Sequence, residues 1–154
     1  MLLSHFASLP RRQSILVSPL MKFITLFFLA ALLPVAGFAA DVNKITPKDA
    51  DKLVAEGKAV LVDVREPAEW AETGVAEKAV LLPKSDFDGA QKLWKDFLAH
   101  NGDKEVILYC RSGKRAGVIG TALAAKGVKV ANAGGFSDWT SAGLPTRKVE
   151  AAKP

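Results

Sequence analysis

In Val106-Ile-Leu-Tyr-Cys-Arg-Ser-Gly-Lys-Arg-Ala-Gly-Val118, a short apolar run passes into a polar loop and then directly into a helical pattern. A continuous apolar run of this length is typical of a strand that is buried on both faces of a parallel sheet. In open α/β sheets, ligands bind beyond the carboxyl ends of the strands. The sequence therefore predicts that Cys110 lies at the edge of the sheet where binding sites form.

Strand and helix patterns alternate on both sides of this run. Buried strands are predicted at 59–64 and 105–109, and shorter strands at 80–83 and 128–131. Helices are predicted from Thr46-Pro47 to Gly57, at 66–72, at 86–100 as one continuous helix, and at 118–125, with a turn at Gly134-Gly135. This order predicts a single α/β domain with a mostly parallel central sheet and helices on both faces.

The N-terminus has the three parts of a secretory signal peptide. Lys22 supplies a positive charge, residues 23–33 form a short apolar core, and small residues lead up to Ala39 and Ala40. We expect cleavage after Ala39, or else after Ala40. The sequence thus predicts a signal peptide over 1–39 and a periplasmic domain over 40–154, with its core at 45–146.

Two alternatives stay open for this region. A membrane anchor fits less well, because the uncharged segment 23–40 only just reaches spanning length and contains Pro34 and Gly37. Arg11-Arg12 resembles a twin-arginine export signal, but the apolar core begins well after the pair. Met21 followed by lysine looks like a natural start, so residues 1–20 are either part of the chain or an extension from an upstream start codon.

Charge and composition narrow the classes of function. The chain has 154 residues and a formal net charge of +5, and removal of Arg11, Arg12 and Lys22 leaves 18 basic and 16 acidic residues, a net charge near +2. No basic run interleaved with aromatic residues remains, so nothing supports nucleic-acid binding. The mature chain has one cysteine, Cys110, and one histidine, His100, too few for a metal site of Cys and His ligands.

Several features around Cys110 favour a negative charge on its sulfur. The loop is short, so successive backbone N–H groups form an anion-binding nest, and the following helix presents its positive N-terminal end. Nearby cations add to this effect and favour the thiolate, which is the nucleophilic form. We expect a reactive nucleophile and not a buried core cysteine, because burying unpaired charges beside it is costly. The cradle consists of Arg111, Ser112, Gly113, Lys114 and Arg115.

The spacing of this loop excludes two phosphate-binding motifs. A P-loop requires Ser or Thr after Gly-Lys, whereas Arg115 follows Gly113-Lys114. A cysteine phosphatase loop of the Cys-x5-Arg kind requires arginine six residues after the cysteine, and position 116 is alanine. The loop from Cys110 to Arg115 is therefore smaller than the loop that such phosphate chemistry uses.

Three segments, in the family's order, resemble single-domain rhodaneses, which are sulfurtransferases. They are Leu61-Val-Asp-Val-Arg-Glu-Pro-Ala-Glu-Trp70, the loop Cys110-Arg-Ser-Gly-Lys-Arg115, and Gly134-Gly-Phe-Ser-Asp-Trp-Thr-Ser-Ala-Gly-Leu-Pro145. The chain departs from the family where members often have Gly-His-Ile, because it has Thr73-Gly74-Val75. We expect this departure to affect local packing more than activity.

The resemblance implies a ping-pong sulfur transfer that needs no metal or organic cofactor. The Cys110 thiolate would take the outer sulfur of an anionic donor, thiosulfate or polysulfide, and the resulting persulfide would pass it to cyanide, a thiol or a sulfur-accepting protein. The backbone N–H groups of residues 111–115 would hold the persulfide. Arg115, with Arg111 or Lys114, would bind the donor, while Asp63 and Arg65 would brace the loop by charged hydrogen bonds.

Two further functions stay open for the same cysteine. One is a non-catalytic persulfide carrier that hands sulfur to a partner with little turnover on free thiosulfate. The other is a redox sensor in which Cys110 is oxidised or pairs with another chain. The loop favours sulfur transfer or carriage, because a sensor does not need a cradle of three cations.

Overall fold

The computed structural model describes residues 42–150. The predicted signal peptide, 1–39, and the last four residues of the chain, 151–154, lie outside this described part. Among the described residues, no helix is long and apolar enough to cross a membrane.

The centre of the domain is a five-stranded sheet in the order β1-β6-β5-β2-β4, and each pair of neighbouring strands runs parallel. Its strands are β1 (Asn43–Lys44), β2 (Ala59–Asp63), β4 (Val80–Leu81), β5 (Glu105–Cys110) and β6 (Val130–Gly135). A small antiparallel pair joins β3 (Val75–Ala76) to β7 (Thr146–Arg147). The predicted parallel α/β fold is confirmed.

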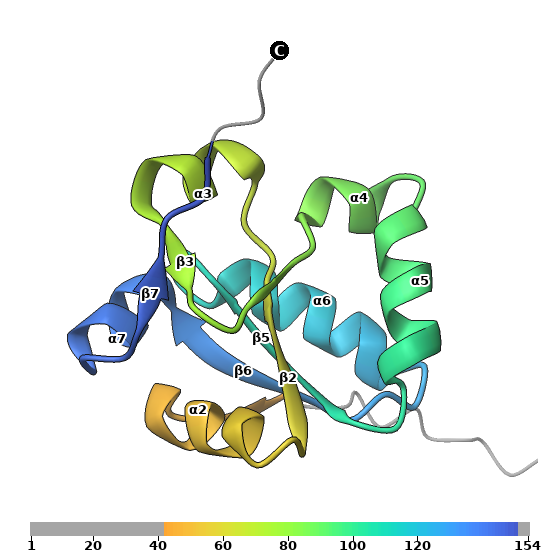
Figure 1. Cartoon of the computed structure of the whole chain (residues 1–154). Coiled ribbons are helices and arrows are strands. Elements are labelled where there is room, and N and C mark those ends of the chain that lie inside the picture. The colour runs from red at the N-terminus through yellow and green to blue at the C-terminus, as the bar shows by residue number, and fades with distance from the viewer. Residues whose placement is uncertain (1–41, 151–154) are drawn as a thin grey trace, which may run out of the picture. The chain divides into compact units, whose positions relative to one another are not determined.

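Helices cover both faces of the sheet (Figure 1). One face carries α2 (Pro47–Ala55) and α7 (Phe136–Ser141), and the other carries α4 (Lys84–Asp88), α5 (Lys92–Asn101) and α6 (Lys114–Ala124). The remaining helix, α3 (Pro67–Thr73), follows the carboxyl end of β2. The first of these helices, α2, begins as predicted, because the Thr46 hydroxyl accepts the Asp49 N–H at 3.2 Å and Pro47 occupies the first turn.

The central strand β5 divides its side chains between two apolar cores. Ile107 and Tyr109 face the core under α2 and α7, whereas Val106, Leu108 and Cys110 face the core under α5 and α6. Successive side chains of a strand point to opposite faces of a sheet, which produces this division. The alternation of side chains along β5 therefore directs the cysteine toward α6.

The helix predicted over 86–100 is wrong in one respect, because the structure divides it into α4 and α5. The chain turns sharply between them, and Gln91 takes a left-handed conformation with φ of 53°. The Asp86 carboxylate compensates by accepting the backbone N–H groups of Lys92, Leu93 and Trp94 at 3.1 to 3.2 Å. A remote side chain thus supplies the N-terminal cap that the apolar spacing alone did not reveal.

The strand boundaries also differ from the predictions. The last parallel strand covers Val130–Gly135 and not 128–131, so the expected turn at Gly134-Gly135 is instead the end of β6, followed at once by α7. The strand predicted at 80–83 is reduced to the edge strand β4. The two-residue strands β1, β3 and β7 were not predicted, because two residues carry no periodic pattern.

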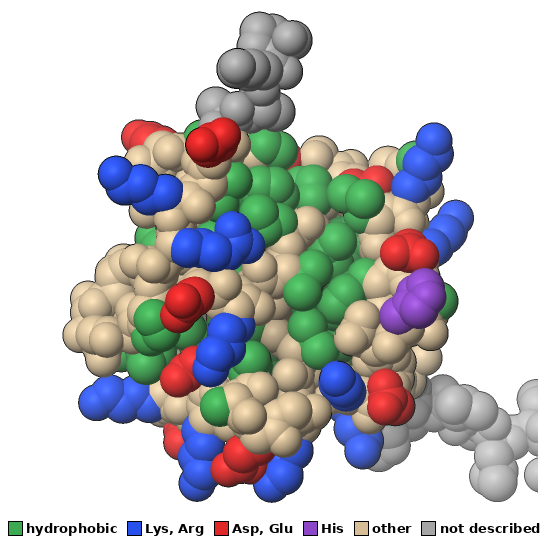
Figure 2. Space-filling model, viewed as in Figure 1, with side chains coloured by type: hydrophobic (Ala, Val, Ile, Leu, Met, Phe, Trp, Pro, Cys, Tyr) green, Lys and Arg blue, Asp and Glu red, His purple; other side chains and the backbone are tan. Residues whose placement is uncertain are grey.

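Charged residues of both signs are mixed on the face seen in Figure 2. They surround a band of hydrophobic side chains that lies between α3 and α4 and continues beside α5. This mixture agrees with the near-neutral charge expected of the mature chain.

Replacement of Asp86 by alanine tests the cap of α5. The substitution leaves three backbone donors without their acceptor, so we expect Asp86→Ala to lower the free energy of unfolding by about 0.5–2 kcal/mol. Urea denaturation of the domain measures this difference. The exposed Asp103→Ala variant is the control, and an equal effect of the two substitutions would contradict the capping role.

Candidate active site

Cys110 is the last residue of β5, and its register partner is Gly135 at the end of β6. The side chain is only 1 % exposed and belongs to the core that contains Ala116 and Ile119 of α6. The expectation that nearby cations keep this cysteine out of the core is therefore wrong. Arg111 and Lys114 are exposed, whereas Cys110 is buried in this core.

The loop after Cys110 presents unpaired backbone donors. Gly113 takes the left-handed conformation, with φ of 80°, and α6 begins at the next residue. Within residues 42–150, the backbone N–H groups of Ser112, Gly113, Lys114 and Arg115 donate no hydrogen bond to a protein atom. Unpaired N–H groups at the first turn of a helix form a ready site for a negative charge. These donors are available to an anion on the sulfur.

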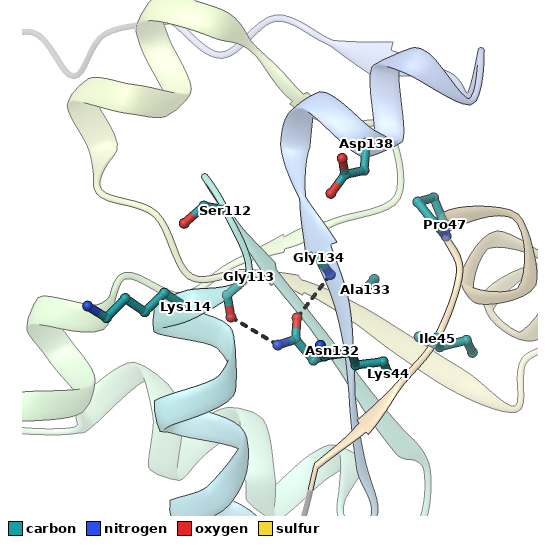
Figure 3. A pocket seen from close by; sticks show the side chains of 10 residues that line it. All are labelled: Lys44, Ile45, Pro47, Ser112, Gly113, Lys114, Asn132, Ala133, Gly134 and Asp138. Carbon is teal, nitrogen blue, oxygen red and sulfur yellow. Dashed lines mark hydrogen bonds between the residues drawn. The ribbon is translucent and has the colours of Figure 1, made fainter.

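Asn132 of β6 fixes the shape of the loop from the side (Figure 3). Its amide nitrogen donates to the Gly113 carbonyl at 2.9 Å, and its amide oxygen accepts the Gly134 N–H at 2.9 Å. Gly135 lies so close that a Cβ atom there would be 2.7 Å from the Arg111 carbonyl oxygen. The Asn132 side chain thus holds the loop against the end of β6, and glycine at position 135 leaves room for this close approach.

Arg115 is bound by Glu69 of α3. Its two terminal nitrogens donate to the two carboxylate oxygens at 2.6 and 2.7 Å, a bidentate pair. The hydrogen bonds with Arg115 lower the pKa of the Glu69 carboxyl to about 2. They also raise the pKa of the Arg115 guanidinium, and the neighbouring Cys110 sulfur shifts this pKa in the same direction. Glu69, Arg115 and the sulfur therefore form one connected group.

Arg65 and Asp63 form a second, fully buried ion pair. Asp63 is 0 % and Arg65 2 % exposed, and the closest nitrogen–oxygen distance between them is 2.6 Å. Burial is the largest single influence on the pKa of Arg65 and lowers it, but the hydrogen bonds and charge of Asp63, together with Tyr109, raise this pKa above its usual value. The guanidinium also lies 4.3 Å from the centre of the Phe136 ring, a cation–π contact.

The segment that departs from the family pattern completes the hydrogen bonds of Arg65. Its guanidinium donates to the Thr73 hydroxyl at 2.8 Å and to the Gly74 carbonyl at 2.7 Å. These contacts, with those to Asp63, join Arg65 to β2 and to the end of α3. The structure thus places Asp63 and Arg65 beside the active loop, and their hydrogen bonds extend toward α3 and away from the loop.

The structure separates the predicted cradle residues onto two sides of the loop. Arg111 lines a pocket of about 530 Å³, which we call the mouth pocket, together with Arg65, Glu69, Glu72, Phe136 and Ser137. Ser112, Gly113 and Lys114 line a second pocket of about 480 Å³ with Lys44, Asn132 and Asp138 (Figure 3). Cys110 directly precedes the loop and is not among the lining residues of either pocket. Within residues 42–150, no group of three or more His, Cys, Asp or Glu side chains is placed to hold a metal ion.

Two residues of the site were not predicted. Glu69 was read only as part of a short helix, yet the pattern Glu66-x-x-Glu69 holds a signal, because it matches the spacing of a capping box. In the structure the Glu69 carboxylate accepts the Glu66 N–H at 3.0 Å, which turns it toward the helix N-terminus and the loop. Asn132 lies just beyond the strand predicted at 128–131, so no pattern in the sequence singled it out.

Comparison with known families matches residues 46–142 to the rhodanese-like domain. The chain belongs to this family. The match confirms the resemblance that the three sequence segments indicated.

Two curated relatives of this rhodanese-like chain share part of their length with it. An uncharacterized protein of Synechocystis is 34% identical over 110 residues, which cover 70% of this chain and 58% of that protein. A probable adenylyltransferase/sulfurtransferase of Mycobacterium tuberculosis is 38% identical over 104 residues, which cover 67% of this chain and 23% of the relative. The chain therefore spans from about a quarter to little more than half of these proteins.

Solved structures show the same fold. The polysulfide-sulfur transferase homodimer of Wolinella succinogenes is 28% identical, with a TM-score of 0.57 over 84% of this chain and 92% of that chain. A rhodanese-related protein from Thermoplasma volcanium is 24% identical and has a TM-score of 0.58, over 68% of this chain and 97% of the other. Sulfurtransferases are thus among the relatives of this chain.

The pH dependence of stability tests the Glu69–Arg115 pair. A carboxyl whose pKa is lowered from 4.5 to about 2 stabilises the fold above pH 4.5, and this stabilisation is lost as the pH falls toward 2. We expect Glu69→Gln to lower the free energy of unfolding at pH 7 by about 1–3 kcal/mol. The difference from wild type should shrink between pH 4.5 and 2, as followed by urea denaturation at each pH.

Glu72→Gln is the matched control for that experiment, because Glu72 lies on the same helix and forms no ion pair among the described residues. A loss in Glu69→Gln that stays constant from pH 7 to pH 2 would contradict the assignment of the stabilisation to the ionised pair.

Proposed function

We propose that this chain is a sulfurtransferase that carries a sulfane sulfur on Cys110 as a persulfide. The observation that carries the proposal is the place of Cys110 at the end of β5, directly before a loop in which four backbone N–H groups have no protein acceptor among the described residues. Such donors stabilise a persulfide anion. Cys110 is the single cysteine of the chain, so it is the only thiol that can accept the sulfur. Membership of the rhodanese-like family supports the same reaction.

In the first half-reaction, the Cys110 thiolate attacks the outer sulfur of an anionic donor. With thiosulfate, a new S–S bond forms on Cys110, the S–S bond of the donor breaks, and sulfite leaves with the electron pair. With polysulfide, the leaving group is the shortened chain. The sulfurtransferase of Wolinella succinogenes that resembles this chain supports polysulfide as a donor.

Each part of the site has a role in this step. The N–H groups of residues 112–115 stabilise the negative charge of the persulfide without a mobile counter-ion. Glu69 holds the Arg115 guanidinium in place in the first turn of α6, so this cation needs no reorganisation when negative charge develops on the nearby sulfur. Arg111, which has no ion-pair partner among the described residues, attracts the donor to the mouth pocket.

In the second half-reaction, a cyanide ion or a thiolate attacks the outer sulfur of the persulfide. The S–S bond to Cys110 breaks and the cysteine leaves as the thiolate that began the cycle. A carrier would complete the first half-reaction and pass the sulfur only to a partner protein. A redox sensor is disfavoured, because a sensor cysteine does not need a following loop of unpaired backbone N–H groups.

The sequence features of residues 1–39 add a location to the proposal. We propose that the chain is exported and that the domain acts in the periplasm. Cysteines in that compartment usually form disulfides, but Cys110 has no second cysteine in the chain with which to pair.

The intact mass of the protein after incubation with thiosulfate tests the persulfide. We expect the wild-type chain to gain one sulfur atom, which dithiothreitol removes, and the Cys110→Ser variant to gain none. The same measurement with polysulfide separates the two donors. Absence of the added sulfur with both donors would contradict the proposed function.

Turnover then separates an enzyme from a carrier. A sulfurtransferase releases thiocyanate continuously from thiosulfate and cyanide, whereas a carrier gives a single turnover. Steady-state release at many times the protein concentration is the expected result.

A further inference from the structure

The mouth pocket carries four charged side chains, and two of them are already neutralised. Arg65 is paired with Asp63 at 2.6 Å, and Glu69 is paired with Arg115 at 2.6 and 2.7 Å. Bidentate and buried pairs of this kind leave little charge for a ligand. The paired residues therefore shape the pocket and contribute little to its net potential.

The two remaining charges have opposite signs and lie on different walls. Arg111 stands on the active loop and Glu72 on α3, and both side chains belong to exposed residues. Neither forms an ion pair with any residue in 42–150. Phe136 and the Ser137 hydroxyl lie at a third wall, formed by the start of α7. The pocket thus offers one free cation, one free carboxylate and an aromatic surface.

This arrangement suits a zwitterion better than a dianion. A dianion in the pocket meets one attractive charge and one repulsive charge, whereas a ligand with an ammonium and a carboxylate meets a partner for each. At an accessible site, complementary charges contribute more to the choice between ligands than to the strength of binding. Arg111 still attracts the donor anion, but the sulfur that the donor leaves on Cys110 is held by the backbone N–H groups of residues 112–115 and not by the two free charges of the pocket.

We propose that the mouth pocket selects as sulfur acceptor a thiol that carries both an ammonium and a carboxylate group, that is, an α-amino-acid thiol such as cysteine. Glu72 binds the ammonium and Arg111 the carboxylate, which directs the thiol toward the loop. This inference rests on the proposed function, because it concerns the acceptor of the Cys110 persulfide. The acceptor thiolate, after loss of its proton to solvent, attacks the outer sulfur, and Cys110 departs as a thiolate with no net oxidation.

The test isolates the second half-reaction. The protein is first loaded with sulfur from thiosulfate or polysulfide, and the loaded fraction of each variant is measured by intact mass. The loaded protein is then mixed with cysteine, cysteamine, 3-mercaptopropionate or 2-mercaptoethanol, and loss of the persulfide is timed. Each thiol's rate with a variant is divided by its rate with wild type, so differences in intrinsic nucleophilicity cancel.

Two variants give opposite patterns if the proposal holds. Glu72→Gln should slow transfer to cysteine and cysteamine by about two- to fivefold and spare 3-mercaptopropionate. Arg111→Gln should slow transfer to cysteine and 3-mercaptopropionate by a similar factor and spare cysteamine. Both effects should weaken at high salt, because the charges are exposed. Asp103→Asn and Lys126→Gln, exposed residues outside the pocket, should change none of the rates.

The alternatives are distinguishable. If persulfide forms but both variants alter all four thiols equally, or alter none, the charge-selective pocket is overturned while the proposed function stands. If the wild-type protein forms no persulfide with either donor, the proposed function fails, and this inference fails with it.

Discussion

The buried guanidinium of Arg65 organises the carboxyl edge of the sheet. It joins the end of β2 through Asp63, the end of α3 through Thr73 and Gly74, and the start of α7 through the Phe136 ring. Burial of a charge is tolerable only with such complete pairing, and removal of one partner leaves the other charge uncompensated in the core. One side chain therefore joins α3 and α7, which form two walls of the mouth pocket, to the end of β2.

This arrangement changes the explanation of how the site holds negative charge. Counting arginines near Cys110 suggests a strongly cationic cradle, but Arg65 and Arg115 are each matched by a carboxylate. Under the proposed function, the charge of the persulfide is met instead by the N–H groups at the start of α6, where Arg115 is held by Glu69. A preorganised backbone nest stabilises one small anion without attracting every anion in solution.

Local patterns in the sequence were sufficient to predict the alternating fold and the strand–loop–helix unit around Cys110. These features depend on runs of four or more residues whose burial follows from their apolar pattern. Contacts between distant segments were not predicted. The Glu69–Arg115 pair joins residues 46 positions apart, and the Asp86 cap acts across a turn that interrupts a regular helical pattern. The burial of Cys110 was missed because neighbouring charges need not share the direction of its side chain.

The central claim is that Cys110 carries sulfur within the backbone nest. A crystal structure of the protein after incubation with thiosulfate or polysulfide tests it most directly. The account predicts density for one additional sulfur atom bonded to the Cys110 sulfur, within hydrogen-bonding distance of backbone N–H groups of residues 112–115. An unmodified Cys110 in protein loaded under conditions that saturate sulfur uptake, or an added sulfur directed into the core beneath α6, would contradict it.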